Sequence, residues 1–150
     1  VDVNKIISRS VDLHKLSELD LSFNVSNGKS SNNINGDEEQ LNRVFINLIK
    51  NSIESIHEKK IKNADFKGKI NVDIKVDSDY IIVTIVDNGV GFDQVDKTKM
   101  LTPYYTTKKK GTGLGLAIVT KVINDHSSTI LFKSVKDGAK IEITLPKYYD

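Results

Sequence analysis

The sequence predicts a single α/β domain, and three observations lead to this fold class. Apolar residues recur at helical spacing from 37 to 59 and again from 113 to 126, which predicts two amphipathic helices. Four shorter segments have the composition of strands and form two hairpins, 70–76 with 80–86 and 129–135 with 140–145. A chain of 150 residues, 38% hydrophobic and 28% charged, is long enough to bury one core of its own.

The composition excludes several classes of function. The 22 basic and 20 acidic residues leave a net charge of +2, so nothing in the charge indicates a nucleic-acid partner. The absence of cysteine excludes disulfides, thiolate metal sites and cysteine nucleophiles. No apolar run reaches the length of a membrane span and no signal peptide is visible, so we expect no membrane contact in this segment. The chain starts at Val1 without a methionine, which suggests a fragment or a processed product.

The first third of the chain has weaker patterns. Residues 1–16 show partial helical spacing, which predicts a short helix or a segment that comes in from a preceding domain. Leu19 to Val25 alternates weakly and predicts an edge strand. Residues 26–36 are rich in Ser, Asn and Gly and predict a loop.

The long helix begins with a capping signal. Asp37 is a suitable N-cap and Gln40 follows three residues later, as in a capping box. One apolar face then runs along the helix at Leu41, Val44, Phe45, Leu48, Ile49, Ser52, Ile53 and Ile56.

The other face of this helix carries a polar stripe. Asn47, Asn51 and Glu54 lie at i, i+4 and i+7, with Lys50 between them. Asparagine is a poor helix former, so two of them one turn apart suggest amide oxygens offered to a ligand or a cation. A solvated face with a biased composition is the alternative.

The second strand of the first hairpin is apolar at nearly every position, which predicts a central strand, and it ends in Asp-Asn-Gly-Val-Gly. A carboxylate at the end of a buried strand is costly unless it is hydrogen-bonded, and an exocyclic amine of a ligand would supply a donor for Asp87. The alternative is that Asp87 starts an Asx turn before Gly89.

Residues 93–110 have few apolar residues and no periodicity, which is typical of a lid or a binding loop. Gly111 to Leu116 then read Gly-Thr-Gly-Leu-Gly-Leu and lead into the second helix. A glycine-rich turn at a helix N-terminus presents free backbone N–H groups and predicts a phosphate site, with a hinge or a helix cap as the alternative. His126 falls at the C-terminus of this helix, where the helix dipole favours a cation, and we expect a structural role for it.

Four segments, in this order, resemble the sequence boxes of the ATP-binding catalytic domain of bacterial sensor histidine kinases, in the GHKL superfamily. Residues 47–51 resemble the N box, 87–91 the first glycine box and 111–116 the second glycine box. Residues 102–108 are similar to the F box, with tyrosines where phenylalanines are usual. The wording Asn-Ser-Ile-Glu-Ser-Ile and Tyr-Thr-Thr-Lys is most similar to the nitrogen-regulation type of sensor kinase.

The resemblance implies a two-layer α/β sandwich of the Bergerat type, a mixed sheet with helices on one face. It also implies that 1–150 form a single ATP-binding catalytic domain. Residues 1–16 would then be a helix that leads in from an absent helical dimerisation and phosphoacceptor domain. The expected location is cytoplasmic, with anchoring of the full-length protein in the inner membrane left open.

Carried over residue by residue, the resemblance implies that Asp87 accepts a hydrogen bond from the adenine amino group of ATP. Asn51 would ligate the Mg²⁺ that bridges the phosphates, with Asn47 and Lys50 beside it on the same helix face as the catalytic residues. The other implied nucleotide-binding residues are Gly89, Gly91, Lys108, Gly111, Thr112, Gly113, Leu114 and Gly115.

The partners also follow from the resemblance. The γ-phosphoryl group would go to a histidine of the helical domain, and from there to the receiver domain of a response regulator, with the full-length protein a homodimer. None of the three histidines here lies in a phosphoacceptor motif, so we expect ATP binding without autophosphorylation by the fragment alone. The chain departs from the family at Ser127-Ser128, where glycines are common, and this puts the helix exit in doubt.

Two alternatives belong to the same superfamily. ATP-hydrolysing members place a glutamate, as general base, one turn before the magnesium asparagine, and Asn47 stands there in this chain. An anti-sigma-type serine kinase has a similar length and similar glycine boxes, but the segment 102–108 fits it poorly.

Overall fold

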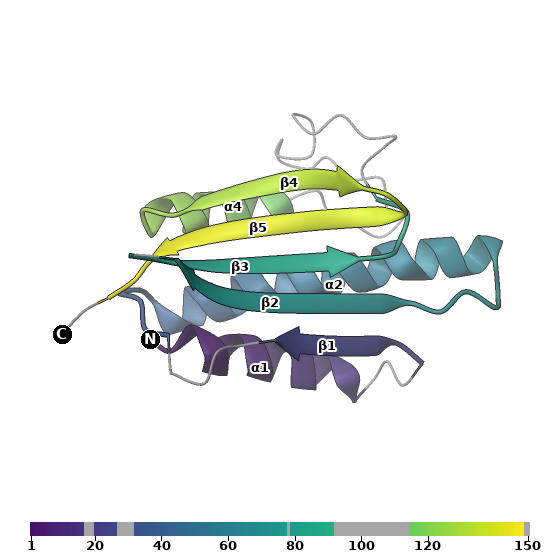
Figure 1. Cartoon of the computed structure of the whole chain (residues 1–150), viewed down its shortest axis with the longest axis horizontal. Coiled ribbons are helices and arrows are strands. Elements are labelled where there is room, and N and C mark those ends of the chain that lie inside the picture. Colours follow the sequence, from purple (N-terminus) through teal and green to yellow (C-terminus); the bar gives the residue numbers. More distant parts are fainter. Residues whose placement is uncertain (17–19, 27–31, 78, 92–114, 149–150) are drawn as a thin grey trace.

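The computed structural model describes residues 1–16, 20–26, 32–77, 79–91 and 115–148. Their elements are α1 (Val3–Lys15), β1 (Ser22–Ser26), α2 (Glu38–Lys62), β2 (Lys69–Asp77), β3 (Tyr80–Asp87), α4 (Gly115–Asp125), β4 (Thr129–Val135) and β5 (Gly138–Pro146). The sheet order is β1-β2-β3-β5-β4, and β1 is parallel to β2 while the other pairs are antiparallel. The described helices lie on one face of this mixed sheet (Figure 1). The predicted two-layer α/β arrangement is confirmed.

Strand β3 is the middle strand of the sheet, as its apolar sequence predicts. Because side chains alternate along a strand, every second residue of β3 faces the helices. The buried residues Ile81, Val83 and Ile85 form this row. Five of their six partners across the sheet are buried as well, Val72 and Ile74 on β2 and Ile141, Ile143 and Leu145 on β5, whereas Val76, the β2 partner of Ile81, is exposed. The helix-facing side of the sheet therefore forms one side of the hydrophobic core.

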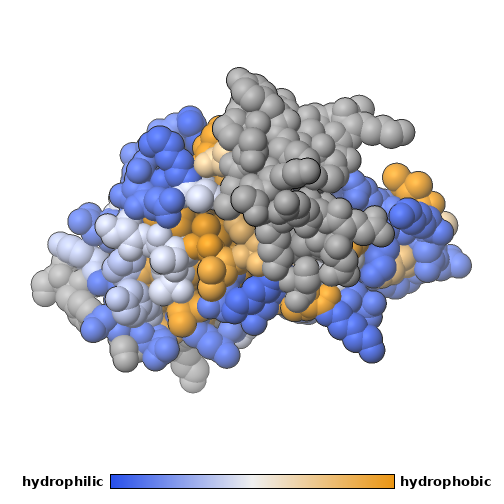
Figure 2. All heavy atoms as spheres, turned by 90° about the horizontal axis from the view of Figure 1, so that it is seen from above, coloured by the Kyte–Doolittle hydropathy of each residue, from blue (hydrophilic) through white to orange (hydrophobic). Residues whose placement is uncertain are grey.

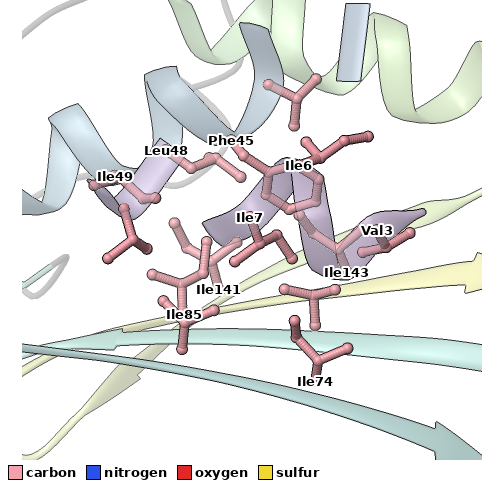
Figure 3. Packing of buried hydrophobic residues seen from close by; sticks show 14 of the residues in the cluster. Val3, Ile6, Ile7, Phe45, Leu48, Ile49, Ile74, Ile85, Ile141 and Ile143 are labelled. Atoms are coloured by element: carbon pink, nitrogen blue, oxygen red, sulfur yellow. The ribbon is translucent and has the colours of Figure 1, made fainter. Parts of the chain in front are cut away.

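The core lies between this row and helices α1 and α2 (Figure 3). Helix α2 contributes Phe45, Leu48 and Ile49, all at most 1% exposed. Helix α1 packs against α2 and buries the apolar residues Val3, Ile6, Ile7 and Val11. The helix predicted within residues 1–16 is confirmed, and its apolar side is part of this core.

The predicted elements are found with small shifts at their ends. Asp37 caps α2, since its Oδ1 accepts a hydrogen bond from the amide of Gln40 at 3.0 Å. Helix α2 runs to Lys62, three residues beyond the predicted end, because lysines are good helix formers. Lys60 also forms an ion pair with Asp20, and this hydrogen bond lowers the pKa of the Asp20 carboxyl.

The exit from α4 shows how a serine replaces the usual glycine. Ser127 has a φ of 56°, in the left-handed region that favours glycine. The amide of Ser128 donates to the Ile123 carbonyl at 3.1 Å, and the amide of Ser127 donates to Asn124 O at 3.0 Å. This is the Schellman pattern of helix termination, so the helix exit keeps its ordinary geometry at the expense of some backbone strain.

His126 has a structural role, but its ring is not the cation that the helix dipole favours. Its Nε2 accepts a hydrogen bond from the backbone amide of Asp37 at 3.0 Å. An accepting Nε2 carries no proton, so Nδ1 donates to the Val122 carbonyl at 2.8 Å and the ring is neutral. The hydrogen bond to Asp37 joins the end of α4 to the start of α2.

The described surface carries mainly hydrophilic side chains, with apolar groups between them, when it is seen from above (Figure 2). Such a mixture is normal for a folded domain. Among the described residues, no helix has the length and apolar character that a membrane-spanning helix requires.

Candidate functional site

Asp87 is the last residue of the helix-facing row on β3. It lies two positions after Ile85, pairs with Ala139 on β5, and is only 5% exposed. Its Oδ1 accepts a hydrogen bond from the amide of Gly89 at 2.9 Å, so the Asx turn is present. This does not exclude ligand recognition, since a carboxylate has two oxygens and about four acceptor positions. The sheet thus turns one carboxylate inward, at the edge of an apolar core.

The turn that follows Asp87 lies directly on helix α2. The amide of Val90 donates to the Ser55 hydroxyl at 2.9 Å and lies 3.4 Å from the Ser55 carbonyl. A Cβ on Gly89 would lie 2.3 Å from Ser55 Oγ and 2.6 Å from the carbonyl carbon of Ser55. Since real side chains do not approach so closely, glycine is required at position 89 for the turn to reach the helix.

The same turn is held on its other side by Asn88. The Asn88 side chain accepts from the Lys69 amide at 2.8 Å and donates to the Lys67 carbonyl at 3.0 Å. The ammonium of Lys59, on α2, donates to the Asn88 carbonyl at 3.1 Å and lies 4.7 Å from the centre of the Phe66 ring. These contacts fix the turn before any ligand binds, which is the arrangement that precise recognition requires.

Two glycines bring β5 close to this turn. Gly91 has a φ of 75°, and a Cβ there would lie 2.6 Å from the Gly138 carbonyl oxygen. A Cβ on Gly138 would lie 1.9 Å from the Asp87 carbonyl oxygen. The backbone of Asp87, Gly91 and Gly138 is therefore packed too closely for a Cβ at either glycine.

Helix α2 brings the polar stripe to the same region. Asn47, Asn51 and Glu54 are half-buried, while Lys50 is exposed. Asn51 precedes Ser55 by four residues, or about 6 Å along the helix axis, and Ser55 contacts the turn after Asp87. The stripe and the inward carboxylate are thus neighbours through Ser55.

The side chains in this region could hold a hard cation such as Mg²⁺ only together with ligands from a bound molecule. Within the described ranges, no cluster of three His, Cys, Asp or Glu side chains could hold a metal ion. Mg²⁺, however, is usually held by one or two protein carboxylates together with substrate phosphates and waters, and an amide oxygen such as that of Asn51 is a hard donor of the same kind. The Ser52 hydroxyl follows Asn51 in the sequence but lies on the apolar, core-facing side of α2, where it is 2% exposed and has no hydrogen-bond partner among the described residues.

Several predicted site residues fall outside the described residues. These are Lys108, Gly111, Thr112, Gly113 and Leu114, together with the lid 93–110 and the F-box segment 102–108. Gly115 is the first residue of α4, and α4 packs against α2. The phosphate site at this helix start stays a prediction.

Sequence reasoning missed four residues that hold the site together: Ser55, Lys59, Asn88 and Gly138. Asn88 and Gly138 stand in predicted turns, where their residue types have ordinary explanations. Ser55 gave a weak signal, since serine is a mediocre helix former placed one turn after Asn51. Nothing in the sequence pairs Lys59 with a carbonyl 29 positions away.

The chain is similar in sequence to one family of ATPases and to several sensor kinases. Residues 36–149 match the family described as histidine kinase-, DNA gyrase B- and HSP90-like ATPase. Sporulation kinase A of Bacillus subtilis (strain 168) is 38% identical over 120 residues, which cover 79% of this chain and 18% of that protein. The sensor histidine kinase ZraS of Salmonella typhimurium is 34% identical, with 97% of this chain and 30% of ZraS covered. For the nitrogen regulation protein NtrY of Azorhizobium caulinodans the identity is 32%, and the shares are 96% and 19%.

The chain spans less than a third of the length of these curated relatives. Solved structures agree with the fold. The catalytic domain of the histidine kinase ThkA, in a nucleotide-free form, matches with a TM-score of 0.82 at 26% identity, covering 98% of this chain and 93% of that one. The mycobacterial sensor histidine kinase MprB matches with a TM-score of 0.83 at 23% identity, covering 100% and 97%.

Proposed function

Since this chain belongs to the histidine kinase-, DNA gyrase B- and HSP90-like ATPases, we propose that it binds Mg-ATP and donates the γ-phosphoryl group to a histidine on a separate helical domain. The observation that carries the proposal is the contact between α2 and the turn after Asp87, made by Ser55 with Gly89 and Val90. It brings an inward carboxylate beside the helix that carries Asn51.

Asp87 recognises the adenine base in this proposal. Its carboxylate is almost fully buried, and one oxygen is held by the Gly89 amide. A buried carboxylate is stabilised by each donor it gains, and the 6-amino group of adenine is such a donor. The glycines at 89 and 91 allow the backbone beside Asp87 to remain close to the base.

Asn51 holds Mg²⁺ through its amide oxygen, and Asn47 and Lys50 lie beside it on α2. When bound, the ion neutralises negative charge on the phosphate oxygens. Lys50 is exposed and adds a positive charge near the phosphates, while Asn47 can orient them by hydrogen bonds. Asn47 cannot take a proton from water at neutral pH, so hydrolysis is slow.

The phosphates lie at the start of α4 in this proposal. Gly111, Thr112, Gly113, Leu114 and Gly115 supply backbone N–H donors there, and the helix dipole favours the negative charge. Lys108 provides a further phosphate contact. The segment 93–110 excludes water as a lid.

The phosphoryl acceptor comes from outside this chain. His126 is neutral and bridges α4 to α2, and His14 Nδ1 lies 2.7 Å from the Ser10 carbonyl on α1. We infer that the acceptor histidine belongs to a helical dimerisation domain of the parent protein. That domain passes the group to the receiver domain of a response regulator. The parent protein is a homodimer, and this domain is cytoplasmic.

The experiment that tests the proposal labels the full-length parent protein with [γ-³²P]ATP. We expect an acid-labile, base-stable phosphoryl group, which is the signature of phosphohistidine. This chain alone should bind ATP without becoming labelled. An acid-stable product would contradict the proposal and favour a serine kinase, and release of inorganic phosphate without labelled protein would favour an ATPase.

A further inference from the structure

The contact of Ser55 with the turn after Asp87 also determines how that turn is positioned. We propose that Ser55 is a positioning residue, which sets the selectivity of the site for adenine by fixing the turn after Asp87 against helix α2. The inference rests on the proposed function, because it concerns how Asp87 reads the base.

The contact is short and leaves little freedom. Ser55 Oγ accepts from the Val90 amide at 2.9 Å, and the place of a Cβ on Gly89 lies 2.3 Å from the same oxygen. That place is also 2.8 Å from the backbone nitrogen of Ile56. The turn therefore rests on the helix backbone itself, with the serine hydroxyl as its hydrogen-bond anchor.

Two consecutive amides connect the hydroxyl to the carboxylate. The Val90 amide is bound to Ser55 Oγ, and the Gly89 amide is bound to Asp87 Oδ1 at 2.9 Å. Adjacent peptide units share a Cα, so a displacement at Val90 moves the Gly89 amide and with it the carboxylate. The orientation of Asp87 thus depends on a side chain of the helix that carries Asn51.

Lys59 holds the same turn from α2, but it cannot replace Ser55. Its ammonium reaches the Asn88 carbonyl at 3.1 Å through a stem with four rotatable carbons. Such a stem follows the turn when the turn shifts. Serine has a single side-chain rotation, so its hydroxyl defines one position.

The test compares nucleotide affinity in Ser55→Ala, Ser55→Thr and the unaltered chain by titration calorimetry with ATP and inosine triphosphate. Inosine has a carbonyl in place of the 6-amino group, so the ratio of the two affinities reports the contact with Asp87. We expect Ser55→Ala to lower the preference for ATP about threefold to tenfold, the range of one hydrogen bond. Ser55→Thr keeps a hydroxyl and should keep most of the preference.

Ser10→Ala is the matched control. The Ser10 hydroxyl is buried and donates to the Ile6 carbonyl at 3.0 Å within α1, so its loss removes a structural hydrogen bond away from the turn. We expect this variant to lose stability with its ATP preference unchanged. Amide exchange adds a second measurement, because Val90 should exchange faster in Ser55→Ala than in the unaltered chain.

An unchanged preference for ATP in Ser55→Ala would overturn the inference, as would unchanged exchange at Val90. A loss of stability alone would do so as well, because that result is what a purely structural serine gives. If the unaltered chain bound neither nucleotide, the proposed function itself would fail. If it bound ATP and inosine triphosphate equally, the adenine role of Asp87 would fail.

Discussion

Gly138 lies against Asp87, so close that a Cβ on Gly138 would be 1.9 Å from the Asp87 carbonyl oxygen. The first residue of β5 is thereby packed onto the last residue of β3, at the position where the site begins. The glycine of an apparently ordinary hairpin turn is thus part of the framework of the site.

Gly138→Ala should destabilise the domain and weaken ATP binding together. The added methyl group must push the Asp87 backbone away, and overpacking of this kind costs about 1–3 kcal/mol of folding free energy. Urea denaturation and ATP titration measure the two effects. Lys136→Ala, at an exposed position of the same turn, should change neither. Normal stability in Gly138→Ala would show that the backbone can yield here.

Asp87→Asn should abolish measurable ATP binding and leave the fold intact. The asparagine amide oxygen can still accept from the Gly89 amide, so the Asx turn survives the substitution. The other atom becomes a donor, which faces the adenine amino group donor to donor. Calorimetry measures the binding and a thermal melt measures the fold. Unchanged ATP affinity would refute the adenine assignment.

Asn51→Ala should weaken ATP binding much more with Mg²⁺ than without it. The substitution removes an amide oxygen that suits this cation and leaves Asp87, the proposed adenine acceptor, unaltered. Affinity measured with Mg²⁺ and with a chelator gives the comparison. Asn42→Ala, nine residues or about two and a half turns earlier on α2 and away from the polar stripe, is the control. An equal loss with and without Mg²⁺ would argue for a direct contact with the nucleotide.

His126→Ala should destabilise the start of α2. It removes the acceptor of the Asp37 amide, and a lost hydrogen bond of this kind costs about 0.5–1.5 kcal/mol. Chemical denaturation measures the loss, with His57→Ala at an exposed position of α2 as the comparison. If both variants were equally stable, the hydrogen bond between His126 and Asp37 would contribute nothing to the free energy of unfolding.

Ser127→Gly should stabilise the domain by about 0.5–1 kcal/mol, because glycine adopts the positive φ of this position without strain. Ser128→Gly should instead destabilise it, since Ser128 is buried and its hydroxyl donates to the His126 carbonyl at 3.0 Å. Melting temperatures of the two variants therefore move in opposite directions. A fall in both would mean that the hydration of Ser127 outweighs its backbone strain.

Local patterns in the sequence were sufficient for the elements. Asp37 predicts the start of α2, and the nearly continuous apolar run before Asp87 identifies the middle strand, since both signals lie within a few residues of the feature they predict. The hydrophobic alternation of β5 likewise predicts a strand with one buried face. His126 was expected to be structural, but its neutral ring depends on a hydrogen bond to a residue 89 positions earlier.

The framework around Asp87 could not be predicted in the same way. Gly138 meets Asp87 because β3 pairs with β5 and not with β4, and this choice is made by the whole sheet. Ser55 contacts Val90 because α2 passes the end of β3 at the position of Ser55 along the helix. Neither contact produces a periodic pattern in the sequence, so both can be recognised only from the tertiary structure.

Asp87 faces the helices because an even number of positions separates it from Ile81, Val83 and Ile85 on β3. Successive side chains of a strand point to opposite faces, so one residue inserted or deleted between Tyr80 and Asp87 would turn the carboxylate to the outer face and bring Asn88 or Val86 inward. An insertion or deletion of two residues would leave the carboxylate on the helix-facing side. In a regular strand, an insertion between the apolar row and Asp87 must therefore contain an even number of residues if both are to stay on the helix-facing side.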